Sequence, residues 1–279
     1  MTGIYTSETG RQAIAERYRA HLDAWPVPHE EIRVPTAAGE TFVVASGPVD
    51  APPLVLLHGS GANASAWRGD VGDWSTRYRV YAVDLPGEPG FSAPRRLALN
   101  SDETASWLSE TVDGLGLTTF ALVGMSLGGW TALDFVLRRP GRVDALTLLC
   151  PGGLGGQRFG WLIKGMALRL IGRQTVRDSA RTVLGIDDAD VLDEVESTFR
   201  HFSPRTGRLP IFPDADLSTV DIPVLVIVGG RDVLFDSART AERARACFAR
   251  GDVRVLPEVG HAVLGQTAEI ERFLSAHTG

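Results

Sequence analysis

A serine with a small residue two positions to either side occurs in residues 124–129, which read Gly-Met-Ser-Leu-Gly-Gly between an apolar run and a helical pattern. A serine hydroxyl is a weak nucleophile unless its oxygen is held out from the backbone beside a base. A sharp strand-to-helix turn does this, and it crowds the backbone so closely that only small residues fit at positions such as Gly124 and Gly128. The same short pattern also arises by chance in a chain with 31 glycines. In its strand–turn–helix context, it predicts that Ser126 is a nucleophile.

A histidine that could act as the base follows a later strand-like run. The chain has six histidines, and His261 comes after Gly260, just beyond the strand-like residues 252–256. A histidine on a loop at the edge of the sheet is well placed to take a proton from Ser126. The alternative is a histidine on a surface loop with no catalytic role.

A carboxylate that could orient this histidine is Asp232, which follows the Val, Leu and Ile run at residues 224–228. Such a run is typical of a strand buried on both faces, and ligands of parallel sheets bind at the carboxyl edge. The alternative role for Asp232 is to cap the helix that starts near Ser237. Asp236 fits that role better because it immediately precedes the helical pattern. The order Ser126, Asp232, His261, each after its own strand, predicts a Ser–His–Asp triad.

A Gly-rich loop follows another buried strand, at residues 54–57. Acyl transfer builds negative charge on the former carbonyl oxygen, and fixed backbone N–H groups stabilise that charge. We expect one donor from Leu127 and the second from Ser60, with Gly61 as the alternative. His58 is interpreted as a residue that shapes this loop by bonding to backbone, rather than as a second base.

Alternating strand and helix patterns must position these loops. From residue 53 onward the alternation indicates βαβ units and a parallel sheet that is covered by helices on both faces. A helix at residues 7–22 and a hairpin spanning 31–45 precede it. The expected strands lie at 53–58, 79–83, 119–124 and 143–149, and the helices near 65–76, 102–115 and 127–138.

The alternation breaks between residues 151 and 217 and resumes at residue 222. Helical patches near 161–171, 176–184 and 190–202 indicate a helical insertion over residues 151–217, which the family resemblance given below implies is a lid. The core then comprises residues 1–150 and 218–279, with 1–28 as an N-terminal helical extension. Within the lid, Trp161, Met166 and Phe199 are candidates for lining an apolar substrate pocket. The alternative is that these bulky side chains pack the lid onto the core.

Length and composition suit one large α/β domain, since the chain has 279 residues and a mass of 30.0 kDa. A net charge of −6 gives no electrostatic footprint for nucleic acid or an anionic membrane surface. Neither Cys150 nor Cys247 has a spacing that suggests a disulfide framework or a metal site. No basic, apolar leader and no run of membrane-spanning length is present, so we expect a cytoplasmic protein that is a monomer or homodimer.

Taken together, these motifs give the chain a resemblance to the α/β-hydrolase superfamily from about residue 30 to the carboxyl terminus. Within the superfamily it is most similar to small bacterial carboxylesterases, which share Trp25-Pro26 at the end of an N-terminal helix and the phrase at residues 50–53. One departure follows residue 87: many relatives carry an aromatic residue or His, then Gly and Ser, where this chain has Glu88-Pro89-Gly90-Phe91-Ser92. The matching stretches are residues 57–61, 82–87, 124–129, 229–232 and 260–261.

The resemblance implies an α/β-hydrolase fold with a mostly parallel sheet of about eight strands. It also implies a serine hydrolase that cleaves carboxylic esters of small to medium apolar substrates through an acyl-enzyme, without a metal or organic cofactor. One alternative is a carbon–carbon bond hydrolase of the meta-cleavage-product type, a family that usually continues the oxyanion loop with Pro-Gly where this chain has Ala62-Asn63. Another is a hydrolase-fold protein that binds a ligand without turnover. Dehalogenase chemistry needs Asp where Ser126 stands.

Overall fold

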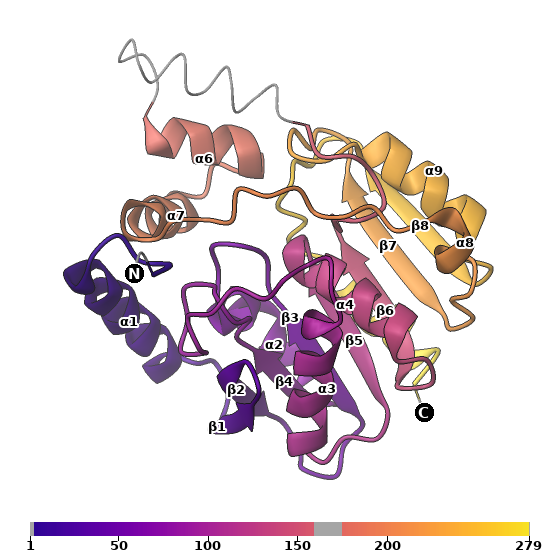
Figure 1. Ribbon diagram of the computed structural model, residues 1–279, viewed down its shortest axis with the longest axis horizontal. Coiled ribbons are helices and arrows are strands. Elements are labelled where there is room, and N and C mark those ends of the chain that lie inside the picture. Colours follow the sequence, from indigo (N-terminus) through magenta and orange to yellow (C-terminus); the bar gives the residue numbers. More distant parts are fainter. Residues whose placement is uncertain (1–2, 159–174, 279) are drawn as a thin grey trace.

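The central feature of the computed structural model, which describes residues 3–158 and 175–278, is a sheet of eight strands (Figure 1). The strand order is β1-β2-β4-β3-β5-β6-β7-β8. The hairpin of β1 and β2 is antiparallel, β2 pairs antiparallel with β4, and every later pairing is parallel. The strands are β1 (His29–Thr36), β2 (Gly39–Ser46), β3 (Pro53–Leu57), β4 (Arg79–Val83), β5 (Phe120–Met125), β6 (Val143–Leu149), β7 (Val224–Gly229) and β8 (Gly251–Leu256).

Helices cover both faces of this sheet, because its central strands are apolar on both sides. All six residues of β7 are buried, as are four of the five residues of β3. Apolar side chains of α3 (Glu103–Gly114), α4 (Leu127–Arg138) and α9 (Ser237–Cys247) pack on one face. Those of α1 (Glu8–Asp23), α2 (Arg68–Trp74) and α10 (Thr267–Ser275) pack on the other, where the 3₁₀ turn η1 (Ala64–Trp67) joins them. The predicted fold class is therefore confirmed.

The chain between β6 and β7 leaves the sheet and forms three described helices: α6 (Val176–Leu184), α7 (Ala189–His201) and α8 (Asp214–Leu217). Figure 1 shows α6 and α7 beyond one end of the sheet, whereas α8 lies beside α9. The helical patch expected near 161–171 lies outside the described residues. So do two of the three candidate lining residues, Trp161 and Met166.

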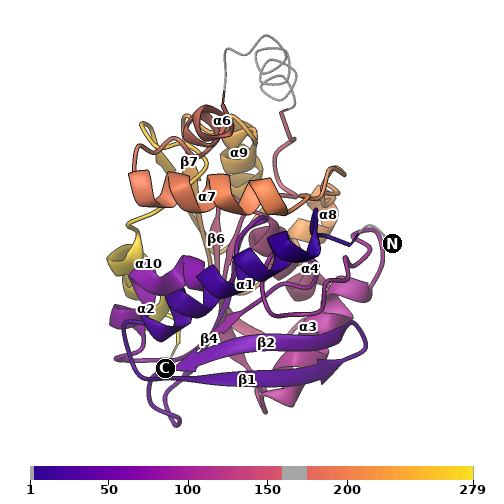
Figure 2. The ribbon, with the colours of Figure 1, turned by 90° about the vertical axis from the view of Figure 1, so that its left-hand side faces the viewer.

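Backbone hydrogen bonds connect the N-terminal segment to the end of α7, although about 190 residues separate the two in the chain. The backbone N–H of Thr6 donates to the carbonyl of His201 over 2.9 Å, and Ser203 donates to Ile4 over 2.9 Å. Figure 2 shows α1 running beside α7.

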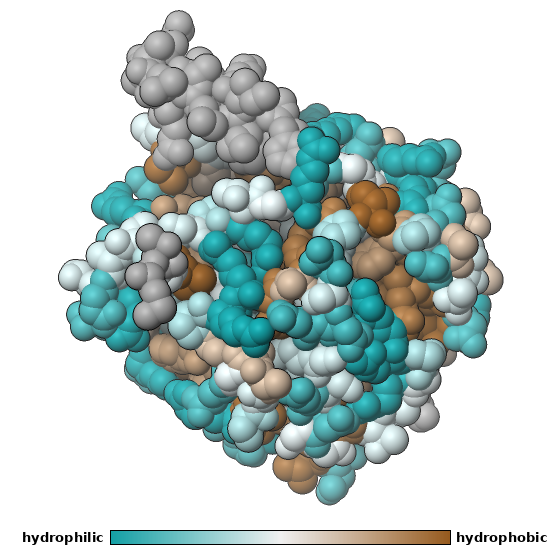
Figure 3. All heavy atoms as spheres, viewed as in Figure 1, coloured by the Kyte–Doolittle hydropathy of each residue, from teal (hydrophilic) through white to brown (hydrophobic). Residues whose placement is uncertain are grey.

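On the face in Figure 3, hydrophilic residues cover most of the surface and apolar residues form separate small areas. Within the described ranges, no helix is long and apolar enough to cross a membrane.

Candidate active site

Ser126 occupies the single residue between β5 and α4, in a backbone conformation that L-residues rarely adopt. Its φ is 53° and its ψ is −108°, and such strained positions cluster at functional sites. A Cβ atom at Gly124 would lie 2.4 Å from the carbonyl oxygen of Gly128. A Cβ atom at Gly128 would lie 2.1 Å from the carbonyl oxygen of Leu57. The turn therefore requires both glycines, and it lifts the serine side chain out of the backbone.

The side chain of His261 lies within hydrogen-bond distance of both Ser126 and Asp232. Oγ of Ser126 is 3.0 Å from Nε2 of His261, and Nδ1 of His261 is 2.8 Å from Oδ2 of Asp232. When Nδ1 carries the proton, its N–H donates a hydrogen bond to the carboxylate. Nε2 is then unprotonated and can accept the proton of the serine hydroxyl. His261 and Asp232 are 7% and 4% exposed, so water competes little for these contacts.

The carboxylate is held by the backbone of its own loop. Oδ1 of Asp232 accepts hydrogen bonds from the N–H groups of Leu234, at 2.7 Å, and Phe235, at 3.1 Å. Asp236 has a different task, because its carboxylate accepts from the N–H of Arg239 and caps α9. The structure thus places Asp232, and not Asp236, against His261.

The environment of His261 acts on its basicity in two opposing ways. Burial disfavours the charged imidazolium and lowers the pKa of His261, whereas the Cys150 side chain and the carboxylate of Asp232 raise it. The net effect is a raised pKa. The loop that carries His261 is also tied to the end of α6, since Ala262 N–H donates to the carbonyl of Leu184 over 3.0 Å.

The loop after β3 faces the serine from the other side. Gly59 lies so close that a Cβ atom on it would be 3.5 Å from Cβ of Ser126. The N–H of Gly61 is already engaged, because it donates to Oε2 of Glu88 over 2.7 Å. Ser60 is therefore the better candidate for the second oxyanion donor. Leu127 is the first residue of α4, so its N–H has no acceptor within the helix.

His58 is used to shape this loop. Its Nε2 accepts a hydrogen bond from the N–H of Leu85 over 3.0 Å, and its Nδ1 lies 2.8 Å from the carbonyl oxygen of Gly59. Burial lowers the pKa of His58 to about 4, so the ring is neutral at neutral pH. Both ring nitrogens are occupied by backbone, which leaves His58 no part in proton transfer.

A sequence model of the alpha/beta hydrolase family matches residues 54–273. The chain belongs to the alpha/beta hydrolase family. It is 30% identical over 283 aligned residues to the uncharacterized carboxylesterase nap of Bacillus subtilis, covering 95% of this chain and 93% of that protein. Carboxylesterase YbfK of the same organism is 29% identical, with 88% and 86% covered. The crystal structure of naproxen esterase from Bacillus subtilis superposes with a TM-score of 0.83, at 26% identity, over 96% of this chain and 99% of that chain.

In this α/β-hydrolase, Phe199 is the one of the three candidate lining residues that the structure describes, and it lies over the loop after β3. A Cβ atom at Gly61 would be 2.7 Å from Cζ of Phe199, a residue of α7. The Phe199 side chain remains 37% exposed, whereas Phe202, one turn further on, is buried against Ile4 and Ile14. The ring of Phe199 is therefore exposed to solvent and lies beside the candidate site.

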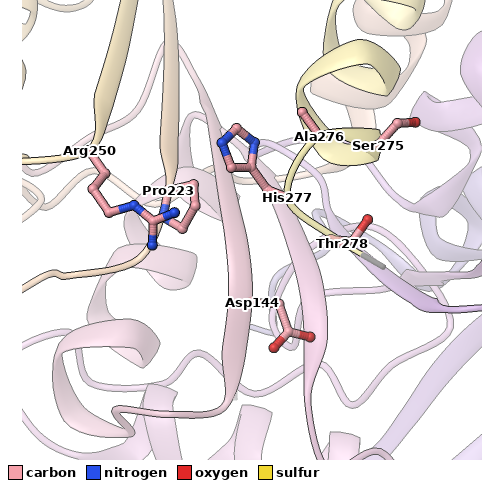
Figure 4. Close-up of a pocket in the computed structure, with 7 residues that line it drawn as sticks. All are labelled: Asp144, Pro223, Arg250, Ser275, Ala276, His277 and Thr278. Carbon is pink, nitrogen blue, oxygen red and sulfur yellow. The ribbon is translucent and has the colours of Figure 1, made fainter.

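A separate surface hollow lies at the opposite edge of the hydrolase sheet (Figure 4). Its wall includes Asp144 near the start of β6 and Pro223 just before β7, together with His277 beyond α10. Ser126 and Asp232 follow the carboxyl ends of their strands, so this hollow is remote from them. In residues 3–158 and 175–278, no group of three or more His, Cys, Asp or Glu side chains could hold a metal ion.

Two residues at the hydrolase site were not assigned a role from the sequence. Glu88 accepts hydrogen bonds from Ser60 and Gly61 in the loop after β3, and Cys150 follows β6 with a positive φ of 39° beside His261. For Glu88, the one signal in the sequence was the departure of residues 88–92 from the common family pattern. Cys150 gave no signal, because its proximity to His261 depends on how the loops after β6 and β8 come together at the edge of the sheet.

Proposed function

We propose that this α/β-hydrolase is a carboxylesterase that cleaves small to medium apolar esters through an acyl-enzyme on Ser126. The observation that carries the proposal is the continuous contact from Oγ of Ser126 through His261 to Asp232. It is supported by relatives named as carboxylesterases that align over almost the whole chain.

In the proposed mechanism, Oγ of Ser126 attacks the ester carbonyl carbon while Nε2 of His261 takes the hydroxyl proton. Asp232 holds the imidazole in the required tautomer and stabilises its cation. The N–H groups of Leu127 and Ser60 stabilise the oxyanion. His261 then gives its proton to the leaving alcohol. A water molecule, activated by the same imidazole, releases the acid and restores Ser126.

Substrate access is proposed to depend on a lid formed by residues 151–217, on a core of residues 1–150 and 218–279. Two contacts support this assignment. The end of α6 is bonded to the loop of His261, and α7 places Phe199 over Gly61. The lid then contacts both the loop of His261 and the loop that carries Gly61, so that it limits the size of the acyl or alcohol group. Trp161 and Met166 retain their proposed lining role from the sequence.

The decisive experiment is turnover of p-nitrophenyl esters with acyl chains of two to twelve carbons by the purified protein. The proposal predicts hydrolysis of at least the short and medium esters, with a preferred chain length. A vinylogous diketone tested in parallel addresses carbon–carbon bond cleavage. Binding of these compounds without any turnover would support a ligand-binding protein and overturn the proposal. Sedimentation and cell fractionation would test the proposed monomer or homodimer and the cytoplasmic location.

A further inference from the structure

Glu88 is a buried carboxylate that contacts the oxyanion loop at two adjacent residues. Its side chain is 2% exposed, in the loop that follows β4. Oε2 accepts a hydrogen bond from Oγ of Ser60 over 3.0 Å and another from the N–H of Gly61 over 2.7 Å. Burial of an acid is costly unless its oxygens are bonded in this way. We propose that Glu88 is a positioning residue that orients the oxyanion loop for catalysis.

The first consequence concerns which backbone N–H can face the substrate. The bond to Glu88 occupies the N–H of Gly61, so that this N–H is not free to donate to a substrate oxygen. It also fixes the peptide plane between Ser60 and Gly61, because that peptide is planar. Gly61 has a φ of +76°, a conformation that favours glycine. The carboxylate therefore restrains both Ser60 and Gly61, and it leaves the N–H of Ser60 as the candidate oxyanion donor of the two.

The second consequence concerns the charge on Glu88. Burial raises the pKa of Glu88 to about 7, and the donors on Gly61 and Ser60 and the guanidinium groups of Arg96 and Arg205 limit that rise. Arg96 comes from the same loop and Arg205 from the segment after α7. The phenol of Tyr5, in the N-terminal segment, donates to the carbonyl of Gly90 and is near enough to Glu88 to interact with its charge. Because the ionised carboxylate is the stronger acceptor, the loop is held most firmly when Glu88 is charged.

A residue that positions oxyanion donors acts on the transition state more than on the bound substrate. The oxygen carries full charge only after the serine has attacked. Loss of the correct loop geometry should therefore lower kcat and leave KM for a small ester nearly unchanged. A role in stability alone would lower the melting temperature without this kinetic separation.

The inference rests on the proposed esterase function, and the test begins with an active wild-type protein on p-nitrophenyl acetate. We expect Glu88→Ala to lower kcat by about 10- to 100-fold with KM changed by less than about threefold, since complete loss of an oxyanion donor costs more than its displacement. Affinity for phenylboronic acid, whose tetrahedral adduct places an oxygen in the oxyanion hole, should fall by a similar factor. Asp134→Ala is the matched control, because Asp134 is an equally buried acid in α4 whose carboxylate is paired with Arg138.

Glu88→Gln keeps the shape of the side chain and one acceptor but removes its ionisation. We expect this variant to retain most of its activity at pH 7 and to show a shallower fall of kcat towards acid pH than the wild type. It also serves if Glu88→Ala does not fold. An unchanged pH profile in Glu88→Gln, or a Glu88→Ala variant whose only defect is a lower melting temperature, would overturn the inference. An inactive wild-type protein would instead overturn the esterase function itself.

Discussion

Nδ1 of His261 lies 2.8 Å from Oδ2 of Asp232, and both side chains are shielded from solvent. Asp232→Asn should therefore lower kcat by about 10³- to 10⁴-fold, because the amide favours the wrong imidazole tautomer. Asp236→Asn is the matched control and should cost only the α9 cap, about 1 kcal/mol of stability. Steady-state kinetics and thermal unfolding of both variants check this assignment. A larger loss of kcat in Asp236→Asn would show that the acid is wrongly assigned.

The same pair predicts a change in pH dependence. Against the effect of burial, the Cys150 side chain and the carboxylate of Asp232 raise the pKa of His261, and the base must be neutral to take the serine proton. In the wild type, kcat/KM should fall as the pH drops below that raised pKa. Without the negative charge of Asp232, the pKa of His261 falls, so the acid limb of the residual activity should move to lower pH. A shift of that limb to higher pH in Asp232→Asn would contradict the electrostatic account.

The residues of the proposed triad could be found from the sequence because their chemistry restricts their type and their position relative to strands. Ser126 needs glycines nearby, and Asp232 and His261 each follow a strand. For the second oxyanion donor the sequence favoured Ser60 and left Gly61 as the alternative, and the contact that engages the N–H of Gly61 could not be foreseen. That contact is made by Glu88, which reaches the loop from a different connection, 27 residues beyond Gly61.

The helices and parallel strands were also predictable, because burial on one or both faces leaves a periodic pattern. The sequence pattern carries less information about contacts between residues that are far apart in the chain. Nothing local indicates that the segment before α1 pairs with the end of α7, or that Phe199 lies over Gly61. Such contacts depend on how separate elements pack, and each is made by only a few residues.

The strained turn at Ser126 predicts a difference between two glycines. Gly128→Ala should lower the melting temperature by several degrees or prevent folding, because its Cβ atom would lie 2.1 Å from the carbonyl oxygen of Leu57. Gly72→Ala in α2 is the control, since no atom lies within 4 Å of the added Cβ. It should be neutral or raise stability by up to about 1 kcal/mol. Equal melting temperatures in the two variants would contradict the crowded turn.

Two phenylalanines of the proposed lid predict different outcomes on truncation. Phe199→Ala should alter KM or the preferred acyl chain length, because the ring is exposed to solvent and lies beside the proposed oxyanion loop. Phe202→Ala should instead cost about 3 to 5 kcal/mol of stability, because that ring is buried. Chain-length profiles and thermal unfolding of each variant provide the check. Destabilisation of Phe199→Ala with an unchanged profile would argue against a specificity role for the lid.

The central claim is that Ser126 is the nucleophile of an esterase. Its most direct test is kcat for a p-nitrophenyl ester in Ser126→Ala, compared with the wild type at equal folded concentration. The account predicts a loss of about 10⁴-fold or more, with the fold intact, since removal of a triad nucleophile leaves only binding and the oxyanion hole. A folded Ser126→Ala variant with a near-native rate would contradict it.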